Sequence, residues 1–450
     1  MRFLRDSPDL TVAVIGFGYV GSCLGVTLAE QGMTVIGIDS DRELIGELER
    51  GHCRTAEPGL AEALTALRDS PRLSFTTDYT GVDAADVVII TVGTPVDAEG
   101  AMRTEALESV CRQLAPRLRT GQLVILKSTV APGHTRKAVL PLLEAGGARH
   151  GTDFGLAFCP ERLSEGGALA QIRKLPIIVG GCDEESTKAS SEFWHRALGV
   201  PVLEYAAAEV AEIVKLADNW WIDHNIAMAS DLARMCDAFG VDVLDVIDGA
   251  NSLAKGDSYV NILRPSVGVG GSCLTKDPWM AWRAARDRGA RLETIETARK
   301  VNESMPAYAC EMIADGLAKA GKSLDGAVVS VLGIAFKNNT GDLRATPVLP
   351  AVAALRAAGA KVTLFDPLAD PDEAEKMFGL RPVPVLEEAV RDADCLAVLA
   401  GHDPFQRLDF AALGKRVSMP CLVFDGRAYY SRQTIGELYE IGYTYRGIGR

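Results

Sequence analysis

The feature that most constrains the fold is an alternation of short β-branched runs with helix-like stretches over the first two hundred residues. The runs at 11–15, 34–38, 87–91 and 123–126 are mostly apolar and rich in β-branched residues, which predicts buried strands of a parallel sheet. Helix-like segments such as 19–31 and 41–50 lie between them. This βαβ pattern predicts a doubly wound α/β fold.

The alternation stops after about residue 205 and returns from about residue 324. Strands are predicted at 327–332, 361–365, 395–399 and 421–424, with a helix at 347–358, so the chain should contain a second Rossmann-like α/β domain. The stretch 208–239 contains neither Gly nor Pro and has apolar residues on one face. We expect one long central helix there that links the two domains and suits contact with a second subunit.

The length, the net charge and the cysteine pattern exclude several classes of protein. A chain of 450 residues is too long for one core, and its formal charge of −13 argues against non-specific binding to nucleic acid or an anionic membrane. The start of the chain lacks the long apolar stretch of a signal peptide, and no segment has the ~20 apolar residues that span a bilayer. The ten scattered cysteines form no CxxC pair, so they predict reduced thiols in a cytoplasmic protein without a metal site.

A glycine-rich turn follows the first predicted strand and opens the first predicted helix. It has the pattern GxGxxG, in which Gly16 permits the turn, Gly18 lets backbone approach a pyrophosphate and Gly21 lets helix and strand pack closely. Asp39 ends the next strand, 23 residues after Gly16, where a carboxylate binds the ribose 2′-hydroxyl and repels a 2′-phosphate. The turn therefore predicts NAD rather than NADP as cofactor.

Two threonines follow later strands of the same predicted domain. Thr94 lies in Val92–Pro95 and Thr129 in Lys127–Gly133, at the strand ends where doubly wound sheets bind ligands. From the residues alone, a cap or a turn is the simpler interpretation of each.

The segment Ser266–Pro278 places Cys273 after three glycines and three residues before Lys276, which Asp277 follows. Glycines let backbone N–H groups approach an oxyanion, a nearby lysine lowers a thiol pKa, and a carboxylate can activate water. A buried cysteine in a glycine turn is the alternative, and the glycines and charges weigh against it.

Two further segments carry candidate catalytic groups. Glu161 follows a predicted strand and suits a general base, or else only pairs with Arg162. Lys215 and Asn219 are four residues apart on one helix face, where two donors can stabilise an oxyanion. Taken alone, that helix segment is better interpreted as an ordinary solvated face that also includes Glu212.

Seven motifs in this order resemble the UDP-glucose/GDP-mannose dehydrogenase family. They are GFGYVG at 16–21, VGTP at 92–95, KSTVAPG at 127–133, PERLSEG at 160–166, AEIVKLADN at 211–219, GVGGSCLTKD at 268–277 and GIAFKNNTGDLRATP at 333–347. The resemblance covers nearly the whole chain. It implies two Rossmann-like domains joined by a long central helix that forms a homodimer or a larger homo-oligomer.

The resemblance also implies a reaction, in which a nucleotide hexose is oxidised at C6 to a uronate at the expense of two NAD+. Cys273 would hold the carbon as a thiohemiacetal and then as a thioester, which suits two successive hydride transfers. Glu161 would act in hydrolysis, with Thr129 and Asp277 positioning the water. Lys215 and Asn219 would stabilise oxyanions.

The remaining expectations are carried over from the same resemblance. Residues 1–205 would bind NAD, 206–305 would form the helical dimerisation region with the catalytic cysteine, and 306–450 would bind the nucleotide sugar. The expected cofactor-binding residues are Gly16, Gly18, Tyr19, Val20, Gly21, Asp39, Thr94, Thr129, Lys276 and Arg344. The expected substrate-binding residues are Glu161, Leu163, Glu165, Lys215, Asn219, Gly270, Lys337 and Arg427.

Different motifs of the chain indicate different sugars as the substrate. Pro160–Arg162 is closer to family members that oxidise N-acetylated sugars, whereas Ser272–Asp277 is closer to those that oxidise glucose. Many relatives carry a basic residue before the cysteine loop that reaches a neighbouring subunit, and here that stretch is Gly256–Tyr259. The first hypothesis is UDP-glucose or dTDP-glucose, and the second is UDP-N-acetylmannosamine or UDP-N-acetylglucosamine. A non-catalytic sensor of NAD or nucleotide sugars and a single-step alcohol dehydrogenase are the remaining alternatives.

Overall fold

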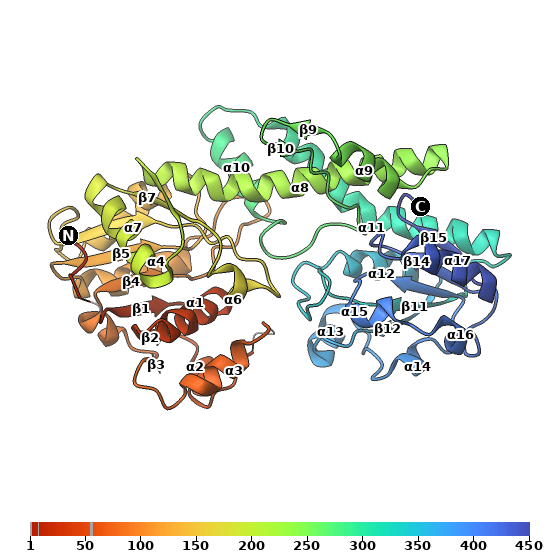
Figure 1. The fold of residues 1–450 in the computed structure, drawn as a ribbon, viewed down its shortest axis with the longest axis horizontal. Helices are drawn as coiled ribbons and strands as arrows, with labels where there is room; N and C mark the ends of the chain where they lie inside the picture. The colour runs from red at the N-terminus through yellow and green to blue at the C-terminus, as the bar shows by residue number, and fades with distance from the viewer. Residues whose placement is uncertain (1, 8, 55–56) are drawn as a thin grey trace. The chain divides into compact units, whose positions relative to one another are not determined.

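The computed structural model describes residues 2–7, 9–54 and 57–450, and its chain divides into two compact units. Unit 1 contains residues 1–218 and 279–291, and unit 2 contains residues 219–278 and 292–450. Each unit is an α/β domain built around one large sheet (Figure 1). The predicted fold class, with two Rossmann-like domains and a long central helix, is confirmed.

The sheet of unit 1 has the strand order β3-β2-β1-β4-β5-β6-β7-β8. Its strands are β1 (Thr11–Ile15), β2 (Thr34–Ile38), β3 (Leu73–Thr76), β4 (Val87–Ile90), β5 (Gln122–Leu126), β6 (Phe154–Phe158), β7 (Ile177–Gly181) and β8 (Val202–Tyr205). The first six positions follow the 3-2-1-4-5-6 order of dinucleotide-binding folds. The strands predicted in this domain are therefore present, and four more complete the sheet.

One strand pair departs from the predicted parallel arrangement. β6 and β7 are antiparallel, while every other neighbouring pair in this sheet is parallel. Two consecutive strands can run parallel only if a crossover connection returns the chain to the same end of the sheet, and this connection is usually a helix long enough to span it. Only the four-residue helix α6 (Ala168–Gln171) lies between β6 and β7, so the chain turns back on itself.

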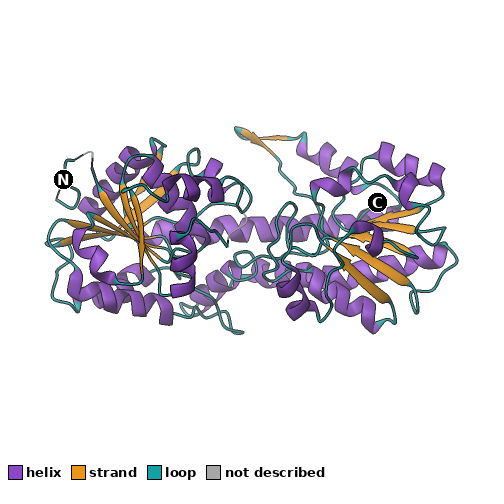
Figure 2. Ribbon diagram, turned by 90° about the horizontal axis from the view of Figure 1, so that it is seen from below, coloured by secondary structure: helices purple, strands orange, loops and turns teal. Residues whose placement is uncertain are grey.

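Helices cover both faces of this sheet (Figure 2). Unit 1 contains α1 (Tyr19–Glu30), α2 (Arg42–Glu49), α3 (Leu60–Leu67), α4 (Glu105–Leu114), α5 (Leu140–Glu144), α6, α7 (Glu184–Leu198) and most of α10 (Asp277–Arg286), with short helices η1 (Tyr79–Ala84), η2 (Ala115–Arg117) and the π-helix η3 (Thr135–Val139). Successive strand residues point to opposite faces, so Val12 and Val14 join one buried cluster, whereas Ala13 and Ile15 join another. This two-sided burial accounts for the uninterrupted apolar runs in the sequence.

The sheet of unit 2 is parallel throughout, in the order β12-β11-β13-β14-β15. Its strands are β11 (Val328–Leu332), β12 (Lys361–Phe365), β13 (Cys395–Val398), β14 (Leu422–Asp425) and β15 (Thr444–Gly447). The unit also contains the hairpin β9 (Ala254–Lys255) and β10 (Ser258–Tyr259). Its helices are α9 (Val243–Asn251), α11 (Glu293–Lys319), α12 (Val348–Ala357), α13 (Pro371–Phe378), α14 (Leu386–Ala389), α15 (Asp403–Gln406), α16 (Phe410–Leu413) and α17 (Arg432–Ile441).

The first turn of this second sheet repeats that of the first. Gly333 follows β11 with a φ of +81°, and the Asp366 carboxylate after β12 accepts the Ile334 N–H at 2.7 Å. In unit 1, Gly16 has a φ of +88° and Asp39 accepts the Phe17 N–H at 2.8 Å. The same backbone requirement, a left-handed turn tied to the next strand, therefore produces both Rossmann-like domains.

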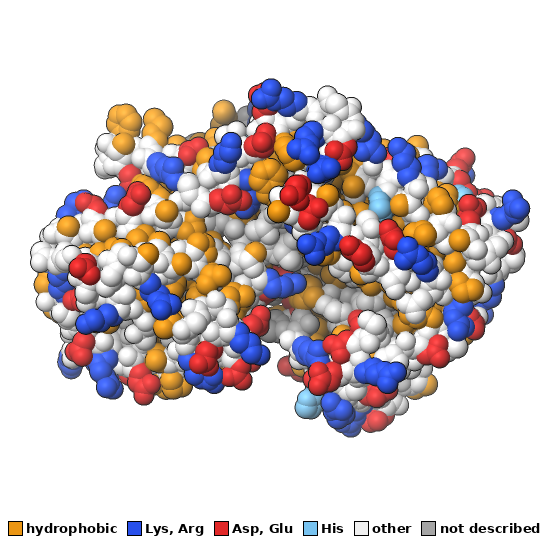
Figure 3. All heavy atoms as spheres, turned by 180° about the vertical axis from the view of Figure 1, so that it is seen from behind, with side chains coloured by type: hydrophobic (Ala, Val, Ile, Leu, Met, Phe, Trp, Pro, Cys, Tyr) orange, Lys and Arg blue, Asp and Glu red, His pale blue; other side chains and the backbone are white. Residues whose placement is uncertain are grey.

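The long helix α8 (Ala208–Phe239) has the bounds that the sequence predicts. None of the described helices is both long and apolar enough to span a bilayer. On the face drawn in Figure 3, acidic and basic side chains are interspersed over the surface.

Candidate functional site

Two glycines after β1 meet different geometric demands. A Cβ at Gly21 would lie 2.1 Å from the Gly16 carbonyl oxygen, so helix α1 can approach β1 only without a side chain there. A Cβ at Gly18 would meet nothing within 4 Å, and Gly18 is exposed at the N-terminus of α1. The first turn of α1 therefore opens onto free space, which fits an anionic pyrophosphate.

The carboxylate of Asp39 lies beside this glycine turn. Its two oxygens accept the N–H groups of Phe17 at 2.8 Å and Asp41 at 3.0 Å, which holds the half-buried side chain at the end of β2. Each carboxylate oxygen has a second acceptor position. The turn, the open helix terminus and the fixed acid together fit NAD.

Thr94 and Thr129 follow the neighbouring strands β4 and β5 and contact each other. The hydroxyl of Thr94, which is 4% exposed, donates to the Thr129 carbonyl oxygen at 2.5 Å. The two threonines thus share the carboxyl edge of the sheet that also carries Gly16 and Asp39.

The loop after β6 holds Glu161, Leu163 and Glu165. Oε1 of Glu161 accepts the Leu163 N–H at 2.6 Å, and Oε2 lies 3.4 Å from Nζ of Lys127. Lys127 directly follows β5, a signal that sequence reasoning did not use.

A second acid fixes the far end of the same loop. The buried Glu57 accepts the N–H groups of Gly166 and Ala168, each at 2.7 Å, and the hydroxyl of Tyr19 at 2.7 Å. Burial, followed by the hydrogen bond to Glu57, raises the pKa of Tyr19, so the phenol stays a donor. Glu57 therefore ties the loop of Leu163 and Glu165 to the first residue of α1. Nothing in the sequence around Glu57 signals this role.

The face of α8 that carries Lys215 is buried, so the alternative of a solvated face is wrong. The exposed fractions of Glu212, Lys215 and Asn219 are 0%, 6% and 7%. Glu212 accepts the N–H of Gly133 at 2.5 Å and both the N–H and the hydroxyl of Thr135, at 2.9 and 2.6 Å. Contact with this loop removes Glu212 from water, which the helical period alone does not reveal.

Cys273 is exposed, unlike the other nine cysteines, all of which the structure describes as buried or half-buried. Its loop lies on Phe336, because a Cβ at Gly270 or Gly271 would approach that side chain to 2.6 or 2.7 Å. Its carbonyl accepts the N–H groups of Lys276 and Asp277, which starts α10 at once. The glycines therefore serve close packing of the loop that carries the exposed Cys273.

Behind this thiol loop lies a polar network of unit 2. The fully buried Asp277 accepts the amide N–H of Asn219 at 2.5 Å and the ammonium of Lys276 at 2.6 Å. The ammonium of Lys276 thus forms an ion pair with the carboxylate of Asp277. The network joins Asn219 on α8 to the residue that follows the cysteine loop.

Arg427 lies near the same Phe336. Its guanidinium donates to the carbonyl oxygens of Leu399 and Phe336 at 2.7 and 2.8 Å, and burial lowers its pKa to about 10. Lys337 is half-buried and follows Phe336 in sequence. Three expected substrate-binding residues, Gly270, Lys337 and Arg427, therefore surround one segment of unit 2. Arg344 is exposed and pairs with Asp342.

The predicted site residues are divided between the two units. Unit 1 contains Gly16, Gly18, Tyr19, Val20, Gly21, Asp39, Thr94, Thr129, Glu161, Leu163, Glu165 and Lys215. Unit 2 contains Asn219, Gly270, Cys273, Lys276, Asp277, Lys337, Arg344 and Arg427.

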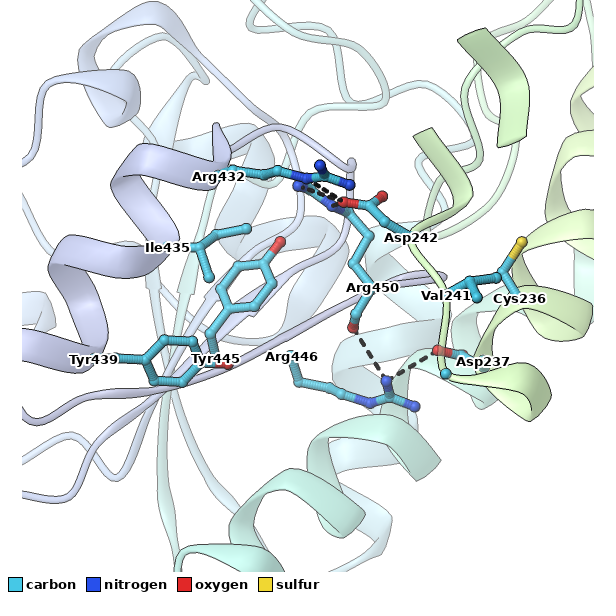
Figure 4. Close-up of a pocket in the computed structure, with 11 residues that line it drawn as sticks. Cys236, Asp237, Val241, Asp242, Arg432, Ile435, Tyr439, Tyr445, Arg446 and Arg450 are labelled. Atoms are coloured by element: carbon cyan, nitrogen blue, oxygen red, sulfur yellow. Dashed lines mark hydrogen bonds and ion pairs between the residues drawn. The ribbon is translucent and has the colours of Figure 1, made fainter. Parts of the chain in front are cut away.

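A separate cavity of about 320 Å³ lies in unit 2 between the end of α8 and α17 (Figure 4). Its three arginines are paired with carboxylates: Arg450 with Asp242 and Arg446 with Asp237, both at 2.9 Å, and Arg432 with Asp245. Because these charges cancel in pairs, the cavity has little attraction for a nucleotide phosphate. None of the predicted site residues lines it.

Comparison with known proteins accounts for both units. Family models match residues 10–198 (UDP-glucose/GDP-mannose dehydrogenase family, NAD binding domain), 209–304 (central domain of the same family) and 330–432 (UDP binding domain).

Two full-length relatives carry different substrate names. The UDP-N-acetyl-D-mannosamine dehydrogenase of Pyrococcus horikoshii is 30% identical over 441 residues, which cover 98% of this chain and 99% of the relative. The UDP-glucose 6-dehydrogenase of Bacillus subtilis is 31% identical over 445 residues, which cover 98% of this chain and 93% of the relative.

A solved structure extends the comparison to the fold. The UDP-glucose dehydrogenase of Pyrobaculum islandicum matches with a TM-score of 0.87 and 29% identity, covering 99% of each chain. The cofactor is NAD, and the chain has the domains of an NAD-dependent nucleotide-sugar dehydrogenase. By the length and the identity of these matches, the chain belongs to the UDP-glucose/GDP-mannose dehydrogenase family.

Proposed function

We propose that this chain oxidises the C6 alcohol of a nucleotide hexose to the uronate in two steps, with Cys273 as the covalent nucleophile. The observation that carries the proposal is the exposure of this one thiol on a close-packed glycine loop. A thiol that is to attack an aldehyde must be accessible, whereas a structural cysteine is normally buried. NAD+, when bound, accepts the hydride that leaves C6 in each step.

Cys273 would hold the carbon between these steps. Its thiolate adds to the C6 aldehyde to form a thiohemiacetal, and loss of a second hydride leaves a thioester. Lys215 and the amide of Asn219 would donate to the oxyanions that form on this carbon. Their burial on one face of α8 supports this role, because donors act more strongly where water is excluded.

Hydrolysis of the thioester would complete the reaction. We assign the base to Glu161, whose Oε1 is held by the Leu163 N–H, and the positioning of water to Thr129 and Asp277. Asp277 is itself held by Asn219 and Lys276, so its carboxylate has a fixed orientation. In the C-terminal domain, Lys337 and Arg427 would bind the nucleotide sugar.

Two kinds of sugar are candidates for the substrate. UDP-glucose, with dTDP-glucose as a variant, is one candidate and is supported by the Bacillus subtilis relative. A UDP-N-acetylhexosamine is the second, and it is favoured by the relative from Pyrococcus horikoshii, which is a UDP-N-acetyl-D-mannosamine dehydrogenase. We further propose the regions 1–205 for the cofactor, 206–305 for dimerisation and 306–450 for the nucleotide sugar, supported by the ranges that the three family models match.

The test is an NADH absorbance assay with a panel of nucleotide sugars that includes glucose, N-acetylglucosamine and N-acetylmannosamine derivatives. Two NADH per sugar consumed supports the four-electron reaction, and the best kcat/KM identifies the sugar. One NADH per sugar would instead indicate a single-step alcohol dehydrogenase. Tight binding of NAD and sugar without turnover would indicate a sensor.

A cysteine variant tests the covalent step. We expect Cys273→Ser to lose uronate formation by at least about 1,000-fold while NAD still binds, because the hydroxyl is a much weaker nucleophile. The half-buried Cys310 on α11 provides the control, and Cys310→Ser should keep activity within a few-fold. Full activity in Cys273→Ser would rule out the covalent mechanism.

A further inference from the structure

Lys127 is a buried cation at the carboxyl end of β5. Its side chain is 5% exposed, and its ammonium lies 3.4 Å from Oε2 of Glu161 and 3.4 Å from the carbonyl oxygen of Pro160. The ammonium also lies 5.2 Å from the centre of the Trp194 ring. These contacts place a full positive charge directly behind the loop of Glu161.

Trp194 on α7 fixes one side of this cation. Its indole N–H donates to the buried Cys159 thiol at 3.2 Å, so the ring that faces Lys127 is held by the segment immediately before Glu161. The face of an aromatic ring attracts a cation, most strongly where water is excluded. Protein groups therefore fix the position of Lys127, and this position does not depend on contacts with solvent.

One carboxylate oxygen of Glu161 remains available to accept a proton. Oε1 accepts the Leu163 N–H at 2.6 Å, whereas Oε2 accepts no hydrogen bond from the described residues and has only Lys127 as ionic partner. A separation of 3.4 Å is long for a hydrogen bond but short for Coulomb attraction. Lys127 therefore faces the carboxylate oxygen that accepts no hydrogen bond from the described residues.

The other titratable groups around Glu161 do not supply this charge. The guanidinium of Arg162 donates to Asp218 at 2.8 Å. Burial raises the pKa of the Cys159 thiol on the adjoining strand end and of the Cys23 thiol on α1, so both thiols are neutral. Lys127 is the cation that faces the free oxygen.

We propose that Lys127 is the positioning residue that keeps Glu161 ionised and aimed for hydrolysis of the thioester. This inference rests on the proposed function. In the step concerned, Glu161 takes one proton from water, the water oxygen bonds to the thioester carbon, the C–S bond breaks, and Cys273 leaves as the thiolate. A buried carboxylate without its cation is protonated at a higher pH and then cannot accept that proton.

The experiment compares Lys127→Met, Lys127→Arg and Glu161→Gln as full-length proteins. Rapid-quench intact-mass spectrometry follows the adduct on Cys273, and product release gives the pH–rate profile of hydrolysis. In Lys127→Met we expect hydrolysis at neutral pH to be slower by about 10-fold or more, with accumulation of the adduct. The acid limb of its profile should move up by about one pH unit or more, so that raising the pH restores the rate. Lys127→Arg keeps the charge and should stay within about threefold of the wild type.

A thermal unfolding curve and an NADH titration accompany each variant, so that a folding defect is recognised. A merely structural role for Lys127 would lower stability or NAD affinity and leave the pH profile in place, which would overturn the inference. If Glu161→Gln accumulates adduct and Lys127→Met does not, only the role of Lys127 is wrong. If neither variant accumulates adduct while the wild type turns over, the role of Glu161 fails as well.

Discussion

Two glycines at the start of α1 differ in what they tolerate. We predict that Gly21→Ala destabilises the protein by about 1–3 kcal/mol, because its Cβ would lie 2.1 Å from the Gly16 carbonyl oxygen and backbone would have to move. Gly18→Ala is the matched control, since its Cβ meets nothing within 4 Å. It should keep the unfolding temperature and weaken NAD binding, because the methyl group occupies the approach to the helix terminus. Thermal unfolding without cofactor and NADH titration separate the two effects, and equal unfolding temperatures would contradict the packing argument.

Histidine burial gives the stability a pH dependence. Burial lowers the pKa of His134, and likewise of His150, below its ordinary value of 6.5. The unfolded chain therefore binds these protons first as the pH falls below 6.5, and stability is lost on the acid side. We expect the unfolding temperature to fall between about pH 7.5 and pH 5.5, with a shallower slope in His134→Gln and the shallowest in the double variant with His150→Gln. An unchanged slope in both variants would assign the acid sensitivity to other groups.

At the scale of elements, α8 is held to unit 1 by one buried carboxylate. Glu212 receives three hydrogen bonds from Gly133 and Thr135, in the loop that follows Thr129, and lies one turn before Lys215. We predict that Glu212→Gln costs about 1–3 kcal/mol, because the amide presents a donor to N–H groups that need an acceptor. Activity should fall with it, because the loop and the helix carry predicted catalytic residues.

Glu209 offers the control for this prediction, one turn earlier on the same helix. It pairs with Arg136 at 3.0 Å, and both side chains are about a third exposed, so water weakens the pair. Glu209→Gln should change the free energy of unfolding by less than about 1 kcal/mol. Denaturant titration measures both variants, and similar losses would mean that burial does not distinguish the two acids.

At the scale of the whole molecule, an exposed apolar row on α8 predicts a homodimer. Trp221, Met228, Met235 and Phe239 are 49%, 51%, 58% and 74% exposed. The first three recur at about two helical turns, and Phe239 follows Met235 by about one turn. Large apolar side chains gathered on one helix face are typical of a surface that binds another protein. A second copy of this chain offers the same row and can pack against it by two-fold symmetry.

The dimer is tested by light scattering during size-exclusion chromatography. The wild type should elute at twice the chain mass of 48.0 kDa, and Met228→Asp with Met235→Asp should elute as a monomer. Leu368→Asp changes an apolar side chain of similar exposure, 48%, away from α8 and should leave the dimer intact. A monomeric wild type would refute the predicted assembly.

The sequence by itself determined the architecture and the chemical motifs. Strand and helix periods are local, so β1, β2, β4, β5 and all of α8 were predictable to within one or two residues, whereas the short β3 was not. The glycine turn, Asp39 and the cysteine loop are also local, because a left-handed turn or a close approach must be satisfied by the residues at that place.

Only the tertiary structure decided which polar groups are buried and what they contact. Strand β7 pairs with β6 in the antiparallel direction, and Glu212 is buried against the loop of Gly133. Lys127 pairs with Glu161, and Glu57 accepts the N–H of Gly166. Each of these contacts joins residues that lie far apart in the sequence. Glu57 and Gly166, for example, are separated by 109 positions. The environment of a charge is set by every chain segment that excludes water from it, so no local pattern encodes it.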